Sequence, residues 1–132
     1  STQFALEILD SSTKIKPVVS GQAVTVNIDI KMRTAFGEQD SEQDMLTEIG
    51  ISKVEQYAEQ TIQYETARVV KDVQQSLGSD IFGFGSAIYY SQPNEWDRIG
   101  SHWEEIFKTL KVKVKADIGI ENTALNMTKG GT

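Results

Sequence analysis

The segment VTVNIDIKMR at positions 24–33 constrains the fold most, because apolar and polar residues alternate along it without a break. A period of two predicts a β-strand with one face in a core and the other in water. The apolar face would carry Val24, Val26, Ile28, Ile30 and Met32. Since other elements must cover that face, the chain is expected to fold around a sheet.

Two further segments alternate in the same way, at 4–9 and 111–121, and predict two more strands. The first is expected to end where SSTKIKP, at 11–17, breaks or turns the chain. Apolar residues recur at helical spacing over 51–77 and predict one amphipathic helix, or two helices broken near Gly50. The helical apolar set is Ile51, Val54, Ala58, Ile62, Val69, Val73 and Leu77.

A second helical region precedes the last strand. Pro93 suits the first turn of a helix, and Trp96, Ile99 and Trp103 follow at helical spacing. Strands with one apolar face and helices between them predict an α+β fold. We expect a two-layer sandwich, in which a small sheet of three to four strands, mostly antiparallel or mixed, carries the helices on one face. The 132 residues are expected to form a single domain, 1–132.

The composition excludes several classes of function. The formal net charge of −6 argues against a sequence-independent grip on nucleic acid, because phosphates require cationic partners. The chain has no cysteine, which excludes disulfides, thiolate zinc sites and cysteine catalysis. No apolar run approaches the roughly 20 residues that span a bilayer, and no signal peptide is visible. We expect no cofactor and no metal.

The glycines of DIFGFG, at 80–85, raise the possibility of a phosphate-binding loop. A dinucleotide-binding loop requires a third glycine, where this chain has Ile88, and it follows a strand, whereas a helix end precedes this segment. The Gly-Lys-Ser/Thr sequence of a Walker loop is also missing. We therefore expect Gly83 and Gly85 to let a helix pack closely on its neighbours.

The same segment contains signals for helix ends. Gly78 is expected to end the long helix, and Ser79 or Asp80 to cap the next one. Phe82 and Phe84 cannot share one face of a helix, so we expect one to pack on the sheet and the other against a neighbouring helix.

The chain shows no assembled set of catalytic residues. His102 is the only histidine, and Glu105 could meet it on a helix surface, but no nucleophile accompanies them. Ser86 lies outside a G-x-S-x-G elbow. The acidic segment at 37–44 lacks the central glycine and the closing glutamate of a calcium-binding loop. The residues alone predict a domain that is not an enzyme.

One ordered set of motifs is more distinctive than any of its parts. DIFGFGSAIYYSQPNEWDRI, followed by HWEEIF and LKVKVKADIGI, resembles the C-terminal domain of the C subunits of bacterial spore germinant receptors, the GerAC-like lipoproteins. The resemblance runs over about 4–120 of this chain. The residues that match the family pattern, and that we expect to be structural, are Asp80, Phe82, Gly83, Phe84, Gly85, Pro93, Trp96, Trp103 and Phe107.

The resemblance implies that the chain is the C-terminal domain cut from a larger lipoprotein, and that this domain is itself soluble. The parent protein would be lipid-anchored at the outer face of the spore inner membrane and act with A- and B-type membrane subunits. The implied function is non-enzymatic, in receptor assembly or signal relay during germination. The candidate interaction surface is the polar sheet face with Lys111, Lys113 and Lys115, together with the acidic segment that begins at Glu38.

Two alternatives belong to other classes of function. One is a hydrolase that uses His102 and Glu105. The other is a small-ligand (germinant) binding domain. Its aromatic pocket would be lined by Phe82, Phe84, Tyr89 and Trp96.

Overall fold

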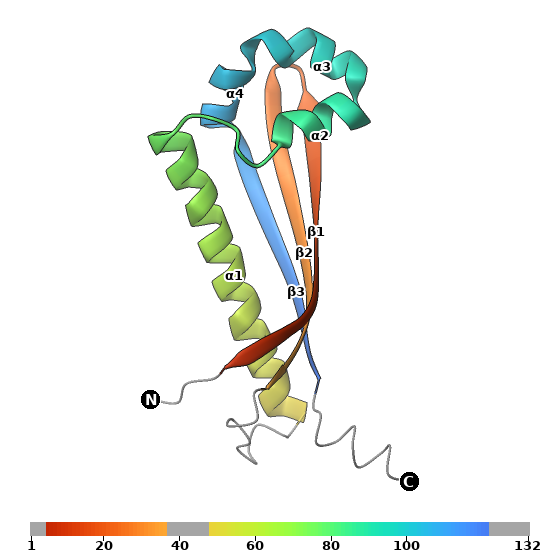
Figure 1. Cartoon of the computed structure of the whole chain (residues 1–132), viewed down its shortest axis with the longest axis vertical. Coiled ribbons are helices and arrows are strands. Elements are labelled where there is room, and N and C mark those ends of the chain that lie inside the picture. Colours follow the sequence, from red (N-terminus) through yellow and green to blue (C-terminus); the bar gives the residue numbers. More distant parts are fainter. Residues whose placement is uncertain (1–4, 37–47, 122–132) are drawn as a thin grey trace. The chain divides into compact units, whose positions relative to one another are not determined.

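The computed structural model describes residues 5–36 and 48–121. The strands pair in the order β1-β2-β3 (Figure 1). The elements in chain order are β1 (Leu6–Ser20), β2 (Ala23–Phe36), α1 (Glu48–Ser76), α2 (Phe84–Ser91), α3 (Pro93–Ile99), the 3-10 turn η3 (Gly100–His102), α4 (Trp103–Thr109) and β3 (Lys111–Glu121).

The sheet is mixed. A two-residue turn joins β1 to β2, which therefore run antiparallel, and Gly21 in this turn has a φ of 62°, a conformation that glycine adopts without a Cβ clash. The carboxyl ends of β2 and β3 lie side by side, which shows that these two strands run parallel. There the Arg33 guanidinium lies 2.6 Å from the Glu121 carboxylate, and the Thr34 hydroxyl donates to the Gly119 carbonyl at 3.2 Å. The predicted α+β class, with a small mixed sheet, is confirmed.

The chain divides into two compact units, and all three strands and α1 contribute residues to both. Unit 1 comprises Ser1–Ser12, Ile30–Ile62 and Ala116–Thr132. Unit 2 comprises Thr13–Asp29 and Gln63–Lys115. The expectation of one domain over 1–132 stays a prediction.

The core of unit 1 lies between the first half of α1 and strands β2 and β3. Val54, Ile118 and Ile120 are buried in it. The partly buried side chains that pack around them are Leu6, Met32, Phe36, Ile51, Ala58 and Ile62. The predicted apolar faces of 24–33 and 111–121 and of the first half of the helix are therefore confirmed.

Unit 2 contains the β1–β2 turn and the short helices α2 to α4, which lie at the same end of the strands in Figure 1. The Gln92 side chain of this unit donates to the Pro17 carbonyl at 3.1 Å. Its buried apolar residues are Val24, Val26, Ile28, Val70, Phe84, Ile88, Ile99, Phe107 and Leu110.

The predicted break in the first strand, at 11–17, is wrong, since β1 runs without interruption through Pro17. The Pro17 carbonyl bonds to a side chain outside the sheet, so the ring nitrogen of the same residue also faces away from β2. β1 is an edge strand, and a proline there costs no ladder hydrogen bond.

The long helix also differs from its prediction. α1 passes through Gly50 without a break. In its second half Val70 is buried, whereas Val69 is exposed, so the buried face there is turned away from the face that the spacing predicts. Leu77 is exposed beyond the helix end. Gly78 ends the helix as predicted, with a φ of 63° and its N–H donating to the Val73 carbonyl at 2.9 Å.

Candidate functional site

The lysine row, which we define as Lys111, Lys113 and Lys115, lies in the part of β3 that belongs to unit 2. All three side chains are exposed, and they alternate with the half-buried Val112 and Val114. Among the described residues, no carboxylate forms an ion pair with any of the three. The row therefore presents three uncompensated positive charges, about 7 Å apart along the strand.

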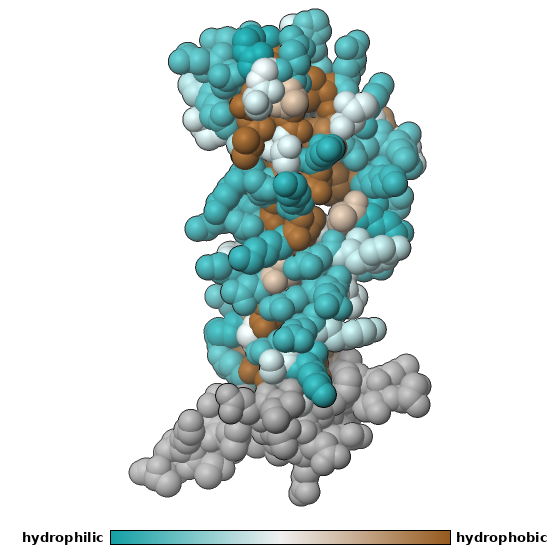
Figure 2. Space-filling model, turned by 180° about the vertical axis from the view of Figure 1, so that it is seen from behind, coloured by the Kyte–Doolittle hydropathy of each residue, from teal (hydrophilic) through white to brown (hydrophobic). Residues whose placement is uncertain are grey.

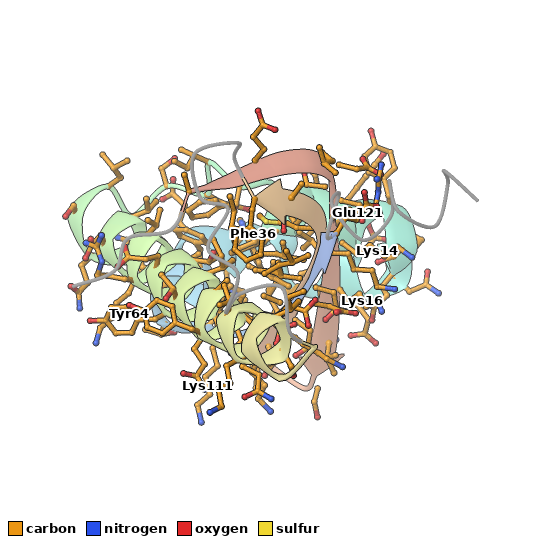
Figure 3. The ribbon with its side chains drawn as sticks, turned by 90° about the horizontal axis from the view of Figure 1, so that it is seen from below. Lys14, Lys16, Phe36, Tyr64, Lys111 and Glu121 are labelled. Atoms are coloured by element: carbon orange, nitrogen blue, oxygen red, sulfur yellow. The ribbon has the colours of Figure 1, made fainter. Side chains whose placement is uncertain are left out.

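Two further lysines of unit 2, Lys14 and Lys16, are exposed on β1. Lys16 pairs with Asp29 at 3.0 Å. In Figure 3, Lys14 and Lys16 point to one side while Lys111 points to another, so they form separate positive patches. Glu38, the acidic member of the predicted interaction surface, lies outside the described residues.

The free edge of β3 in unit 1 is covered by two glutamates of α1. The Glu59 carboxylate accepts a hydrogen bond from the Ile118 N–H at 2.9 Å, and the Glu55 carboxylate accepts one from the Ile120 N–H at 2.8 Å. Sequence reasoning missed this arrangement. The sequence feature that could have predicted it is a pair of glutamates four residues apart on a helix, because such a pair can reach alternate N–H groups of a neighbouring strand.

Unit 2 contains an open groove of about 320 Å³ beside the start of β3. Its floor is apolar and its rim carries Lys71 and Lys108. The face in Figure 2 shows apolar side chains exposed between hydrophilic ones. The groove is lined by Ala67, Val70, Lys71, Gln74, Gln75, Lys108, Thr109, Leu110 and Val112.

Unit 1 contains a shallower hollow of about 430 Å³ with mixed charge. Arg33 in its wall is held by Glu121, and this hydrogen bond, with the charge attraction, raises the pKa of Arg33. The residues lining the hollow are Asp10, Ser11, Ser12, Lys31, Met32, Arg33, Asp117 and Gly119.

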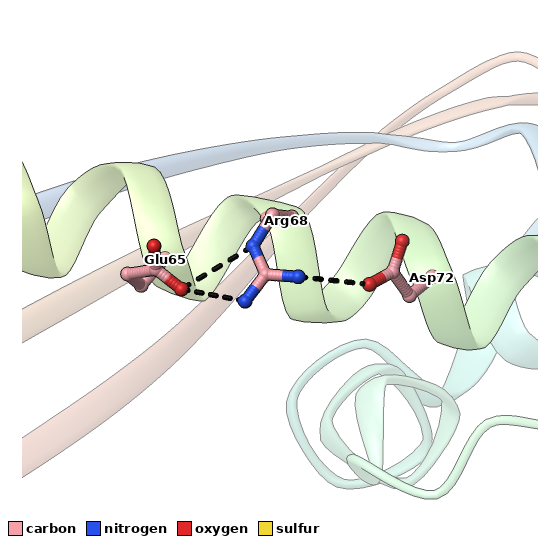
Figure 4. Close-up of polar contacts among 3 residues, drawn as sticks. All are labelled: Glu65, Arg68 and Asp72. Carbon is pink, nitrogen blue, oxygen red and sulfur yellow. Dashed lines mark hydrogen bonds and ion pairs between the residues drawn. The ribbon is translucent and has the colours of Figure 1, made fainter.

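The exposed surface of α1 in unit 2 carries a short ion-pair chain (Figure 4). Arg68 bonds to the Glu65 carboxylate at 2.7 Å and to the Asp72 carboxylate at 3.4 Å. The hydrogen bond to Glu65 is the largest cause that raises the pKa of Arg68. Both contacts follow the helical spacing of three and four residues, so they support the helix locally.

The Asp80 carboxylate is the centre of the predicted motif. One oxygen accepts from the N–H groups of Gly83 at 3.0 Å and Phe84 at 3.1 Å, and the other accepts from Gly85 at 2.7 Å and from the Trp103 indole at 3.1 Å. Asp80 lies three residues before Gly83, which immediately precedes α2. Its carboxylate thus satisfies the backbone N–H groups at the start of this helix. It also ties α2 to α4, which the sequence prediction of a helix start did not include.

The two motif glycines have different reasons for being glycine. Gly83 has a φ of 82°, and a Cβ there would meet nothing within 4 Å. Gly85 lies inside α2, where a Cβ would come within 2.8 Å of the Trp103 indole nitrogen and 3.1 Å of Trp96. Close packing is therefore confirmed for Gly85, whereas Gly83 serves the backbone turn.

The motif aromatics pack on one another. The Phe82 and Phe84 rings are stacked with centroids 5.2 Å apart, and Phe84 lies 6.1 Å from Phe107. The prediction that the first two rings would separate is wrong, because Phe82 precedes the helix and folds back over it. The Trp96 and Trp103 centroids are 5.5 Å apart.

The proposed aromatic pocket does not form from these rings. Phe84 has no exposed surface, and Phe82 is stacked on it. Tyr89 is exposed and packs edge-on against Tyr90, with centroids 5.1 Å apart. The side chains that were expected to line a cavity therefore fill space or lie on the surface.

The residues weighed for catalysis are not brought together. His102 and Glu105 are both exposed, and no hydrogen bond or ion pair joins them in the structure as described. Within residues 5–36 and 48–121, no group of three or more His, Cys, Asp or Glu side chains could hold a metal ion. In the same ranges, none of the helices has the length and apolar character needed to cross a membrane.

These features define an α+β domain whose motif residues bind its short helices together and whose charged strand positions face water. The family model described as "Spore germination B3/ GerAC like, C-terminal" matches residues 1–124, and the chain belongs to this family. The resemblance expected from the motifs is thereby confirmed.

Two curated relatives come from Bacillus subtilis (strain 168). Spore germination protein YndF is 22% identical over 117 residues, which cover 89% of this chain and 29% of that protein. Spore germination protein B3 is 25% identical over 120 residues, covering 90% of this chain and 32% of that protein. The chain thus spans about a third of the length of these relatives.

A solved structure has the same fold. The crystal structure of the GerBC protein superimposes with a TM-score of 0.78 at 22% identity. The match covers 92% of this chain and 42% of that one.

Proposed function

We propose that this domain is a non-enzymatic component of a nutrient germinant receptor, acting in receptor assembly or signal relay during bacterial spore germination. Its family and the names of its relatives, both spore germination proteins, support this role. The partners would be the A- and B-type membrane subunits. The parent protein would be held by a lipid anchor at the outer face of the spore inner membrane.

The lysine row is the observation that carries the proposal. The family-motif residues are occupied within the domain, since Asp80 holds four N–H donors and Phe84 and Phe107 are fully buried. Lys111, Lys113 and Lys115, in contrast, are exposed and have no carboxylate partner in the described part of the chain. An uncompensated positive row on an acidic domain favours binding to an acidic surface over catalysis.

The test is a charge reversal in the full-length parent protein. Lys111→Glu, Lys113→Glu and Lys115→Glu together should slow germination in nutrient while leaving the protein level and the melting temperature of the isolated domain unchanged. A receptor-independent trigger should still germinate these spores at the normal rate, because only the receptor contact is altered.

The matched control reverses three other exposed lysines and changes the net charge by the same amount. These are Lys14, Lys31 and Lys53. Normal nutrient germination in the first variant, or equal slowing in both, would remove the lysine row from the mechanism.

A further inference from the structure

The free edge of β3 is covered in unit 1 but open in unit 2. In unit 1 the glutamates at positions 55 and 59 of α1 accept from the N–H groups of Ile120 and Ile118. A step of four residues along α1 thus matches a step of two along β3. The chain itself therefore satisfies this edge with carboxylates.

Two N–H groups of β3 in unit 2 point the same way. Successive N–H groups of a strand alternate between its two sides, so those of Val112 and Val114 share the direction of Ile118 and Ile120, away from β2. Among the described residues, no side chain accepts from either group. The edge donors of this segment are available to a second chain.

Position 67 of α1 offers no acceptor to this part of β3. After Glu59, the next four-residue steps along α1 reach Gln63 and then Ala67, and the methyl group of Ala67 cannot accept a hydrogen bond. Ala67 and Val112 line the same groove, so the groove opens beside the uncovered edge.

The groove has the chemistry to bind a strand that is acidic and partly apolar. Its floor includes Val70 and Leu110, both buried, and its rim carries Lys71 and Lys108. The Gln74 amide is already committed, donating to the Phe107 carbonyl at 2.8 Å and the Leu110 carbonyl at 3.1 Å. What the groove offers a ligand is therefore apolar area, positive charge and the backbone of β3.

We propose that the groove binds an extended acidic segment of a partner protein, which adds to the sheet along Val112–Val114. Its backbone would pair with the edge groups of β3, and its carboxylates would lie near Lys71 and Lys108. Two observations favour this occupant over others: the positive rim on an acidic chain, and the use of carboxylates at the same edge in unit 1. The inference rests on the proposed interaction function and names the partner chemistry for it.

The test uses a blocked hexapeptide of alternating glutamate and valine, titrated into the isotopically labelled chain and followed by amide NMR. We expect the largest shifts at the amides of Val112 and Val114. A peptide with glutamine in place of glutamate should bind about tenfold more weakly, since charge-assisted hydrogen bonds are the stronger ones. Absence of shifts at these two amides with saturating peptide would overturn the proposal.

The variant Ala67→Glu should place a carboxylate of the chain itself in the groove, beside the uncovered edge of β3. It should weaken peptide binding about tenfold and slow hydrogen exchange at Val114, because the new carboxylate competes for the same N–H. Gln60→Glu adds the same charge at another exposed position of α1 and should change neither. Equal affinity in the Ala67 variant and the wild type would refute the edge site.

Other occupants give other outcomes. If vesicles containing anionic lipid shift the Val112 and Val114 amides and the peptide does not, the occupant is a membrane surface and the proposal fails. It also fails if these amides shift with protein concentration alone, which indicates a second copy. In spores, slowed germination after reversal of the lysine row but not after Ala67→Glu would leave the proposed function standing and remove the edge site.

Discussion

Replacement of Asp80 is the sharpest test of how the motif holds the short helices. The carboxylate accepts from the backbone N–H groups of Gly83, Phe84 and Gly85 and from the Trp103 indole. An ordinary helix N-cap contributes about 1 kcal/mol, whereas a single hydrogen bond to a charged group contributes about 1.5–3 kcal/mol. Water can reach some of the freed donors, so Asp80→Ala should destabilise the domain by about 3 kcal/mol.

Asp80→Asn separates the charge from the shape. Asparagine keeps one acceptor oxygen and turns a donor group towards the remaining N–H groups. Asp80→Asn should therefore destabilise the domain by about 1.5 kcal/mol, roughly half of the loss in Asp80→Ala. Urea unfolding followed by tryptophan fluorescence measures both values, because Trp103 is itself a partner of the carboxylate. A loss below about 1 kcal/mol in Asp80→Ala would refute a role beyond ordinary capping.

A double-mutant cycle with Trp103→Phe isolates the contact between α2 and α4. The phenylalanine keeps the ring packing and removes the indole N–H, so the two changes should couple by about 1 kcal/mol. Strict additivity would mean that the indole bond at 3.1 Å adds nothing to stability.

The remaining predictions concern neighbouring positions in unit 2. Gly85→Ala should cost about 2 kcal/mol, because its Cβ would overlap the Trp103 indole, and urea unfolding measures the loss. Gly83→Ala should cost about 1 kcal/mol from its backbone conformation alone, and Gly83→Asn should recover part of this, whereas Gly85→Asn should not. Arg68→Ala should leave the urea midpoint unchanged, because exposed ion pairs add little stability; a salt-dependent drop would contradict this.

Strands β2 and β3 could be predicted from the sequence because their signal is local, whereas the continuation of β1 through Pro17 could not. Val24, Val26 and Ile28 alternate with polar residues, and a one-residue slip would expose all of them. The course of α1 was harder to predict. The burial of Val70 in place of Val69 depends on which part of the fold the second half of the helix meets, and spacing within the helix does not contain that information.

The motif was recognisable, but its internal contacts were only partly predictable. A helix start at Asp80 follows from residue type, whereas its bond to Trp103 joins residues 23 apart in sequence. The stacking of Phe82 on Phe84 arises because Phe82 lies before the helix, and helix boundaries are the least certain part of any sequence pattern.

The roles of Glu55 and Glu59 could not be predicted from the pattern of charges on the helix alone. On a helix, glutamates four residues apart look like a solvated face, yet both are half-buried and bonded to the edge of β3. The physical requirement behind them is that strand N–H groups near a core need acceptors, from a strand, a side chain or water. Along β3, the N–H groups that α1 covers with carboxylates therefore differ from those beside Ala67 and the lysine row, which have no side-chain acceptor among the described residues. The uncovered segment is where a partner strand would gain hydrogen bonds without displacing any that the described residues make.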